Sequence, residues 1–248
     1  MDINGSIALV TGANRGLGRA ITQRLLERGA AKVYAAARRP ETTDLPGVVP
    51  LRLDVTDPAQ IAAAAERAAD ATLLVNNAGM QSGERLLDGD LGAIRTEVET
   101  HLFGPLQLTR ALAPHLARNG GGAVLNVLSA MSWFGIDGLN GYYIAKAAEW
   151  ALTNGLRLEL ARQGTQATGV HIGVIDTQMS ADWPGDKLAP LDVADIALDG
   201  IQAGAAEILA DDWSRTVKAY LAEDPATVYP RIAAALSTMA GLDDSRVA

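Results

Sequence analysis

The sequence predicts an α/β fold in which a doubly wound parallel sheet is covered by helices on both faces. Short apolar, strand-like runs alternate with helical stretches along the whole chain. Such alternation, with right-handed crossovers, builds a parallel sheet between two helical layers. The first strand-like run also leads directly into a glycine-rich loop and then a helix, which is typical of the start of a dinucleotide-binding fold.

The individual elements follow from the positions of these runs. We expect strands at residues 7–10, 32–37, 48–53, 72–75, 123–128, 169–175 and 207–209. We expect helices at residues 17–28, from 57 onward, at 91–118 as one helix or two, at 140–162, from Asp192 onward and at 213–239. One helix start is well marked, because Asp57-Pro58-Ala59-Gln60 supplies an acidic N-cap, a proline at N1 and a glutamine at N3.

Length and composition favour one domain. The chain has 248 residues, of which 48% are hydrophobic and 20% are charged, as suits a globular protein with one sizeable core. No linker rich in proline, glycine or serine interrupts the chain, and no internal repeat is visible. We therefore expect a single catalytic domain that spans residues 1–248.

Charge, cysteine content and the N-terminus exclude several classes of protein. The net charge of −8 and the isoelectric point near 4.9 argue against a surface for nucleic acid or an anionic membrane. The absence of cysteine excludes disulfides and thiolate metal sites. The three scattered histidines have no metal-ligand spacing, so we expect no metal. No signal peptide or membrane-spanning run is visible, and a soluble cytoplasmic enzyme is the expectation.

A glycine-rich loop, Thr11-Gly12-Ala13-Asn14-Arg15-Gly16-Leu17-Gly18, follows the first expected strand. Glycines at this place let the backbone approach a diphosphate, and the helix behind them offers its N-terminal amides. The alternative is a glycine-rich turn that binds nothing. We interpret the loop as part of a dinucleotide site, with contacts from Gly12, Asn14, Arg15, Gly16, Leu17 and Gly18.

The end of the second expected strand indicates which dinucleotide is preferred. Folds of this kind select NAD with an acidic residue that binds the ribose hydroxyls, whereas this chain has Arg38-Arg39-Pro40 and no acid before Glu41. Arginine suits a 2′-phosphate because its planar fork donates two parallel hydrogen bonds, and Arg15 adds a third cation. NADP(H) is therefore favoured over NAD(H), unless Arg38 and Arg39 are only solvated charges at a strand end.

Ser129, Tyr142 and Lys146 have the spacing of a proton donor for a carbonyl oxygen. Residues i and i+4 of a helix lie on one face, so the Lys146 ammonium can lie beside the Tyr142 phenol. A free tyrosine rarely ionises at neutral pH, and a nearby cation favours its phenolate. Tyr143 is a weaker candidate because its i+4 neighbour is Ala147. Alone, such a pair could also be an accident on a solvated helix.

Together with Asn76-Asn77-Ala78-Gly79 after the fourth expected strand, these motifs resemble the short-chain dehydrogenase/reductase family over roughly positions 5 to 180. The resemblance implies a Rossmann-type sheet of about seven strands in the order 3-2-1-4-5-6-7 and hydride transfer at the nicotinamide. It implies that Tyr142 is the general acid or base. It also implies that Lys146 activates this tyrosine and binds the nicotinamide ribose, and that Ser129 orients the substrate.

The same resemblance extends the cofactor site. It implies that Tyr142 and Lys146 also contact the cofactor. It adds Asp54 and Val55 near the adenine, Asn76, Ala78 and Gly79 after the fourth strand, and Ile175 and Thr177 near the nicotinamide amide. Asp54 could instead only cap a turn.

Two positions depart from the family pattern. His101, in Thr100-His101-Leu102-Phe103-Gly104, stands where the family usually has an asparagine. That asparagine completes a catalytic tetrad and supports a water in the proton relay to the lysine. We expect His101 either to take over this role or only to satisfy the local backbone. After the sixth strand, Ile172-Gly173 replaces the usual Pro-Gly pair.

The substrate end of the site is expected around the loops that follow these motifs. Residues 177–190 should form a lid over the nicotinamide, with Trp183 inside it. Apolar and aromatic side chains around a few polar groups suit a small hydrophobic carbonyl compound. We predict a pocket wall that includes Met80, Gln81, Met131, Trp133 and Phe134. The aromatic residues could equally belong to the core or to a subunit contact.

These observations predict an NADPH-dependent reductase that converts a ketone or aldehyde to an alcohol and can also run in reverse. Alternatives are oxidation of a steroid, retinoid or polyol alcohol, a non-catalytic dinucleotide sensor, and a lyase or dehalogenase on the same scaffold. The intact set of Ser129, Tyr142 and Lys146 argues against the sensor. The helices at 91–118 and 140–162 resemble those through which family members form homodimers or homotetramers, and no insertion before Tyr142 covers them.

Overall fold

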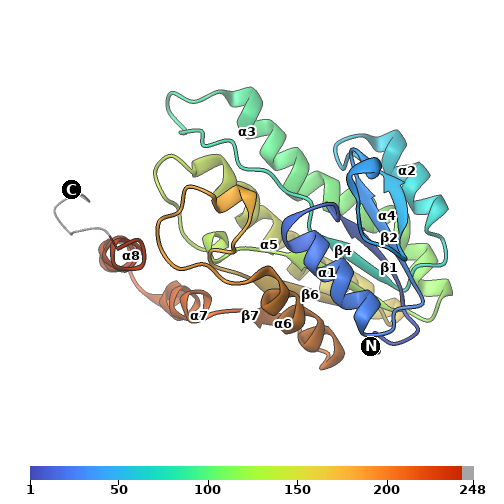
Figure 1. Ribbon diagram of the computed structural model, residues 1–248. Coiled ribbons are helices and arrows are strands. Elements are labelled where there is room, and N and C mark those ends of the chain that lie inside the picture. The colour runs from blue at the N-terminus through green and yellow to red at the C-terminus, as the bar shows by residue number, and fades with distance from the viewer. Residues whose placement is uncertain (242–248) are drawn as a thin grey trace.

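Seven parallel strands form one sheet in the order β3-β2-β1-β4-β5-β6-β7 in the computed structural model, which describes residues 1–241 (Figure 1). The strands are β1 (Ile7–Thr11), β2 (Lys32–Ala37), β3 (Val49–Arg52), β4 (Leu73–Asn76), β5 (Ala123–Val127), β6 (Gln166–His171) and β7 (Glu207–Leu209). The predicted α/β class and strand order are confirmed. Residues 242–248 of the expected single domain lie outside the described part.

Helices cover both faces of the sheet. One face carries α1 (Gly16–Glu27) and α6 (Pro190–Gln202), which pack against each other, and the other carries α2 (Pro58–Arg67), α4 (Gly104–Arg118) and α5 (Asn140–Leu160). A hydrophobic core lies on each face of the sheet. Successive residues of β1 point into one core and then the other, because side chains alternate along a strand. Val10 lies in the core beneath α1 and α6, and Leu9 lies in the core beneath α2, α4 and α5. This double burial explains the continuous apolar runs in the sequence.

Strand β6 begins and ends earlier than the sequence indicates. The expected range was 169–175, whereas the strand is Gln166–His171. The reason is its parallel pairing with β5, which starts at Ala123↔Gln166 and ends at Val127↔Val170. The chain therefore leaves the sheet just after His171, and the segment expected to finish the strand instead runs along the edge of the candidate site.

Two helix starts test the capping predictions. The predicted cap of α2 is confirmed, because Asp57 accepts hydrogen bonds from the backbone N–H groups of Ala59 and Gln60. The helix expected from Asp192 instead begins at Pro190, and Asp192 lies in its first turn. Proline suits the first helical position because the N–H that it lacks would be unpaired there.

The segment expected as one helix or two is divided by a π-helical turn. α3 (Leu91–Val98) continues into the π turn η2 (Glu99–Phe103), and η2 continues into α4. Such turns widen a helix locally and often occur at functional sites. Thr100 and His101 of this turn are buried. Gly104 is required after it, because an added Cβ would lie 2.8 Å from the Val55 carbonyl oxygen.

A third, smaller core lies at the β7 end of the molecule. It is built by α7 (Asp212–Ala219), η6 (Tyr220–Ala222) and α8 (Pro225–Met239), which pack against η3 (Ala130–Ser132) and Phe134. In Figure 1, α7 and α8 lie at the opposite end of the sheet from α2 and β2. The remaining short helices are η1 (Pro40–Thr42), η4 (Ala161–Gln163) and η5 (Gln178–Ser180). Among residues 1–241, no helix combines the length and the apolar character that a membrane crossing needs.

Candidate active site

The candidate site lies where the central strands of the sheet end. Gly12 and Asn77 follow β1 and β4 directly, and Ser129 and Gly173 lie two residues beyond β5 and β6. In open parallel α/β sheets, ligands bind outside the carboxyl ends of the strands, at the point where the strand order reverses. In this sheet that point lies between β1 and β4. The motifs from four separate stretches of the sequence therefore meet at one edge.

The glycine loop after β1 has the shape of a phosphate cradle. Gly12 and Gly16 have φ angles of 66° and 53°, which residues with a Cβ rarely adopt. Gly18 packs on the loop itself, since an added Cβ would lie 2.2 Å from the Gly12 carbonyl oxygen. No side chain caps the N-terminus of α1. Its first amides therefore point into the cradle, where an anion would be stabilised.

Asn77 and Thr11 join this loop to the segment after β4. The Thr11 hydroxyl accepts the N–H groups of Asn77 and Ala78, each at 2.9 Å, and Asn77 Nδ2 donates to the Thr11 carbonyl oxygen at 2.9 Å. Asn76 instead directs its side chain into the interior, where Nδ2 donates to Asn126 Oδ1 at 2.8 Å. Asn76 was expected at the cofactor, whereas the structural role of Asn77 was not expected from the sequence. The alternation of side chains at the strand end was the available signal.

Cations surround the place expected for a 2′-phosphate. Arg15, Arg38 and Arg39 are all exposed. Within residues 1–241, no carboxylate lies within salt-bridge distance of these three arginines. Asn14 Nδ2 donates to Thr42 Oγ1 at 3.0 Å, which holds the glycine loop against the turn that contains Arg39. Arginines without a carboxylate partner beside a glycine loop fit a phosphate ester.

The other predicted cofactor contacts lie around this edge. Asp54 Oδ1 accepts the N–H and the hydroxyl of Thr56, at 3.0 and 2.7 Å, so this carboxylate does cap a turn. Thr177 lies against the glycine loop, since its Cγ2 is 3.3 Å from an added Cβ at Gly16. Ile175 forms an isolated parallel bridge with Leu188. The two ends of the expected lid are thereby tied together beside the cradle.

Lys146 lies one turn from Tyr142 on α5, as the spacing predicts. Its ammonium is 5.8 Å from the centre of the Tyr142 ring. It donates to the Val127 carbonyl oxygen and to Glu149 Oε2, both at 2.7 Å. Lys146 is only 5% exposed. The charge beside the phenol is therefore fixed in position by a strand carbonyl and a buried carboxylate.

The residues on either side of Tyr142 are also fixed. The Tyr143 ring packs against Gly135, since an added Cβ there would lie 2.7 Å from Tyr143 Cε1. Gly141 lies so close to Glu97 that the carboxylate leaves no room for a Cβ. Glu97 is fully buried, and burial raises its pKa. Tyr142, and not Tyr143, is therefore the phenol beside the lysine.

Glu149 and His101 complete a buried cluster with the lysine. They are 2% and 1% exposed, and His101 Nδ1 lies 3.9 Å from Glu149 Oε2. His101 Nε2 lies 2.8 Å from the Met80 carbonyl oxygen and 3.2 Å from the Met80 nitrogen. The His101 ring meets the Tyr142 ring edge-on, with 5.4 Å between centroids. Lys146 and His101 thus adjoin the phenol, and Glu149 adjoins both of them.

Burial and charge together set the protonation of this cluster. Burial raises the pKa of Glu149 to about 7, although Lys146 favours its carboxylate. Burial acts against the Lys146 charge, but the attraction of Glu149 and Tyr142 prevails and raises the pKa of Lys146. Burial and the Lys146 charge hold the pKa of His101 well below its usual value, so His101 is neutral. Glu149 was not among the expected site residues, although its i+3 spacing from Lys146 is visible in the sequence.

Ser129 precedes η3, which packs against α5. Its hydroxyl oxygen accepts the Met131 N–H at 3.1 Å, and its carbonyl oxygen lies 3.0 Å from His171 Nδ1. Accepting one hydrogen bond leaves the Ser129 O–H proton able to donate to a second acceptor. The oxygen of a substrate carbonyl group bound beside Tyr142 would be a suitable acceptor for the Ser129 O–H.

A second cluster of a histidine, a glutamate and a lysine lies beneath Ser129. His171 is fully buried, and its Nε2 lies 3.5 Å from Glu207 Oε1. Lys218 donates to the same Glu207 oxygen at 2.9 Å. Trp133 stacks on the His171 ring with 3.8 Å between centroids, and the Lys218 ammonium lies 4.9 Å from the Trp133 ring centre. Burial lowers the pKa of His171 to about 4, so this histidine is neutral.

The aromatic residues expected to wall a substrate pocket face this second cluster and the third core. Phe134 is 2% exposed and packs with Val217 and Val228. Trp133 stacks on His171 as described, and Met131 packs against the same core. The alternative that these aromatic residues belong to the core therefore fits their positions.

The other expected pocket residues lie closer to the carboxyl edge. Gly79 and Gln81 are exposed and Met80 is half-buried. Gly79 packs directly on the histidine of the π turn, because an added Cβ would lie 2.6 Å from His101 Cε1. In the expected lid, Trp183 is half-buried.

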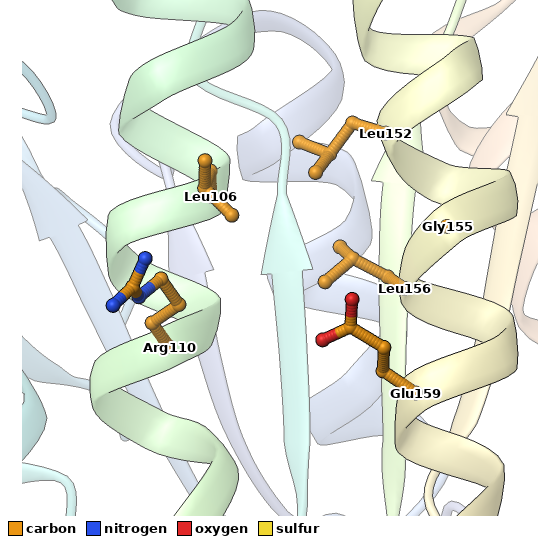
Figure 2. A pocket seen from close by; sticks show the side chains of 6 residues that line it. All are labelled: Leu106, Arg110, Leu152, Gly155, Leu156 and Glu159. Carbon is orange, nitrogen blue, oxygen red and sulfur yellow. The ribbon is translucent and has the colours of Figure 1, made fainter.

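A separate cavity of about 520 Å³ lies between α4 and α5. Figure 2 shows Leu106 and Arg110 on α4 facing Leu152 and Leu156 on α5 across this cavity. It contains none of the predicted catalytic residues. Its lining of leucines, Arg110 and Glu159 belongs to the two helices that are expected to contact another subunit.

Comparisons with known proteins agree with this geometry. The family model described as short chain dehydrogenase matches residues 6–187. A 3-oxoacyl-[acyl-carrier-protein] reductase of Salmonella typhimurium is 30% identical over 236 residues, which are 92% of this chain and 93% of the relative. The corresponding Escherichia coli reductase is 31% identical over 225 residues, 86% of this chain and 92% of the relative.

Solved structures give the same result. A short chain dehydrogenase from Burkholderia cenocepacia, crystallised in complex with NADP, is 40% identical, with a TM-score of 0.89 over 94% of this chain and 99% of the other. A putative short-chain alcohol dehydrogenase from Sinorhizobium meliloti is 28% identical, with a TM-score of 0.78 over 87% of this chain and 98% of the other. The chain belongs to the short-chain dehydrogenase/reductase family and is an oxidoreductase of that family.

Proposed function

We propose that the protein is an NADPH-dependent carbonyl reductase that converts a ketone or aldehyde to an alcohol, reversibly. The arrangement of Tyr142 and Lys146 carries this proposal. The lysine charge is fixed 5.8 Å from the tyrosine ring by two hydrogen bonds of 2.7 Å. A buried cation beside a phenol is suited to proton exchange with a carbonyl or alcohol oxygen. A dinucleotide sensor has no need of it.

The choice of NADP(H) rests on the cradle and its cations. The glycine loop fits a diphosphate because its close contacts exclude side chains. Arg38 and Arg39 are exposed where a dinucleotide with a 2′-phosphate would place that charge. The Burkholderia cenocepacia relative was crystallised with NADP, which supports the same choice. When bound, the nicotinamide supplies the hydride.

The chain's own residues then carry the proton. In the reducing direction, Ser129 donates a hydrogen bond to the substrate oxygen and holds it at Tyr142. Tyr142 gives its phenolic proton to that oxygen, and the Lys146 ammonium stabilises the phenolate that remains. We propose that residues 177–190 close over the site and exclude water.

A substrate and cofactor panel tests this function. Ketones, aldehydes, diketones and a 3-oxoacyl thioester should be compared by the fall in NADPH absorbance; the thioester is included because two relatives are 3-oxoacyl reductases. We expect at least one class to be reduced, with a higher kcat/KM for NADPH than for NADH. Arg38→Asp should reverse this preference, because a carboxylate repels the 2′-phosphate. Equal kcat/KM values for the two cofactors in the wild type would contradict the assignment.

We further propose that the chain forms a homodimer or homotetramer through α4 and α5. The cavity between these helices is lined by three leucines, Leu106, Leu152 and Leu156, beside Arg110 and Glu159 (Figure 2). Leu158 on α5 is 76% exposed. Apolar helix faces of this kind usually mark a contact between copies. Light scattering should give a multiple of the 25.9 kDa chain mass, and the monomer mass at micromolar concentration would contradict this proposal.

A further inference from the structure

The interior side of Lys146 has contacts that the Tyr142–Lys146 spacing alone does not require. A lysine ammonium has three N–H donors. Two of those of Lys146 are taken by the Val127 carbonyl oxygen and by Glu149 Oε2. The third is available on the Tyr142 side. Since Lys146 and Glu149 are 5% and 2% exposed, water does not reach the ammonium freely, and Glu149 is its closest proton-exchanging neighbour in the interior.

The histidine of the π turn extends this arrangement. His101 Nδ1 is buried without a hydrogen-bond partner, and Glu149 Oε2 lies 3.9 Å from it. His101 Nε2 faces both the N–H and the carbonyl oxygen of Met80. If Nε2 accepts the Met80 N–H, Nδ1 carries the proton and faces a carboxylate. If Nε2 donates to the Met80 carbonyl, Nδ1 is a free acceptor and faces a carboxylic acid.

We propose that Glu149, supported by His101, is the positioning residue that holds Lys146 beside Tyr142 and returns to it the proton that Tyr142 gives to the substrate. The inference rests on the proposed reductase function. It assigns the supply of protons to Lys146 to the Glu149 carboxyl group. The family usually has an asparagine on this interior side, at the position of His101.

The proton transfers balance over one turnover. Tyr142 loses its O–H proton to the substrate oxygen and becomes a phenolate. Lys146 gives one N–H proton to that phenolate and becomes a neutral amine. The carboxylic acid of Glu149 gives its proton to the amine and becomes a carboxylate. The carboxylate then regains a proton from water, so one proton enters from solvent for each carbonyl reduced.

The charges around Glu149 are compatible with this role. Lys146 pairs with it on α5, and His101 adjoins it from η2. Tyr142 adjoins Lys146 and His101. Within residues 1–241, His171 of β6 also senses the Lys146 charge. β5 contributes no ionisable residue. Burial raises the pKa of Glu149 to about 7, so both of its protonation states are populated near neutral pH.

The first test is the pH dependence of the wild type and Glu149→Gln, which removes the exchangeable proton with little change of volume. In the reducing direction, wild-type kcat should fall as the pH rises through an apparent pKa near 7, because the donor form of Glu149 is lost. Glu149→Gln should lack this inflection and lose at least about tenfold in kcat below neutral pH. KM should change by less than about threefold. Glu149→Asp, which retains a carboxyl group, should restore the inflection and part of the rate.

Glu207→Gln is the matched control, because it removes a glutamate that also pairs with a lysine beside a histidine, in the second cluster. It should keep the wild-type pH profile. A Glu149→Gln enzyme with the wild-type kcat and inflection would overturn the proposal.

An infrared titration separates this inference from the proposed function. A protonated carboxyl group has a C=O stretching band that disappears on ionisation. The wild type should show such a band titrating near pH 7, and it should be absent from Glu149→Gln and retained in Glu207→Gln. If no carbonyl compound is reduced but the band behaves in this way, the reductase assignment fails while the exchangeable carboxyl stands. If no band depends on Glu149, the inference fails whatever the activity.

Discussion

Two clusters of the same three residue types lie near the candidate site, and their glutamate and lysine side chains differ in exposure. The first is His101, Glu149 and Lys146, whose glutamate and lysine side chains are 2% and 6% exposed. The second is His171, Glu207 and Lys218, with corresponding values of 29% and 33%. The ion pair is 2.7 Å long in the first cluster and 2.8 Å in the second. Similar chemistry and geometry therefore occur in two different dielectric surroundings.

Solvent access decides what each cluster does. A partly exposed pair is screened by water and contributes little free energy. A buried pair carries a large desolvation penalty, and its protonation becomes sensitive to neighbours. The first cluster can therefore exchange protons with Tyr142, whereas the second supports the backbone of Ser129 and the packing of Trp133.

The position of each cluster in the fold explains the difference. The first lies between α5 and the π turn, over the middle of the sheet, where helices cover it. The second lies at β6 and β7, the last two strands, with its lysine on α7, and its glutamate and lysine side chains are partly exposed. Replacing matched residues in the two clusters tests whether burial causes this difference.

Replacing the phenol should have the largest effect. Tyr142→Phe removes the proton donor, so kcat should fall by about 1,000-fold or more, while NADPH affinity measured by fluorescence titration stays within about threefold. Tyr143→Phe is the matched control and should keep most of the activity, because that ring packs against Gly135. If Tyr142→Phe retains most of its turnover, another group must donate the proton.

Replacing the two lysines should give a smaller but clear contrast. Lys146→Met removes the charge beside Tyr142 and leaves Glu149 without its partner, so kcat/KM should fall by about 100-fold. Lys218→Met removes a partly exposed charge. It should change kcat by less than about twofold and cost about 1 kcal/mol or less in the free energy of unfolding. Similar losses of activity in the two variants would show that burial is not the deciding difference.

The pH dependence of stability should differ in sign between the clusters. The pKa of His171 falls from 6.5 to about 4 on folding. Its stabilisation is therefore complete above about pH 6.5 and is lost as the pH falls toward 4. The pKa of Glu149 rises from 4.5 to about 7. Its contribution is therefore complete below about pH 4.5 and is lost as the pH rises through 7.

Urea unfolding across this pH range checks both signs. The free-energy difference between wild type and His171→Gln should grow as the pH rises through the His171 window. The difference between wild type and Glu149→Gln should shrink as the pH rises through the Glu149 window. Each change should be up to about 3 kcal/mol. Differences that do not vary with pH would mean that neither group changes its protonation on folding.

The sequence predicted most of the fold because local patterns were sufficient. Apolar runs located all seven strands, and Asp57 with Pro58 marked a helix start. The strand β6 was placed three residues late, because its ends depend on pairing with β5, which no local pattern reveals. The start of α6 was missed for a related reason: Asp192 is a good capping residue, but the chain enters the helix earlier, at Pro190.

By itself, the sequence determined the fold class, the order of the motifs and the spacing that lets Lys146 adjoin Tyr142. These follow from helical and strand periods, which act over a few residues. Three contacts became visible only in the folded protein: Glu149 holds this lysine, His101 faces Glu149 from another helix, and Trp133 stacks on His171. Such contacts join residues from separate elements, and their energies depend on burial. The sequence shows which ionisable side chains are present, and tertiary packing decides which of them are buried away from water.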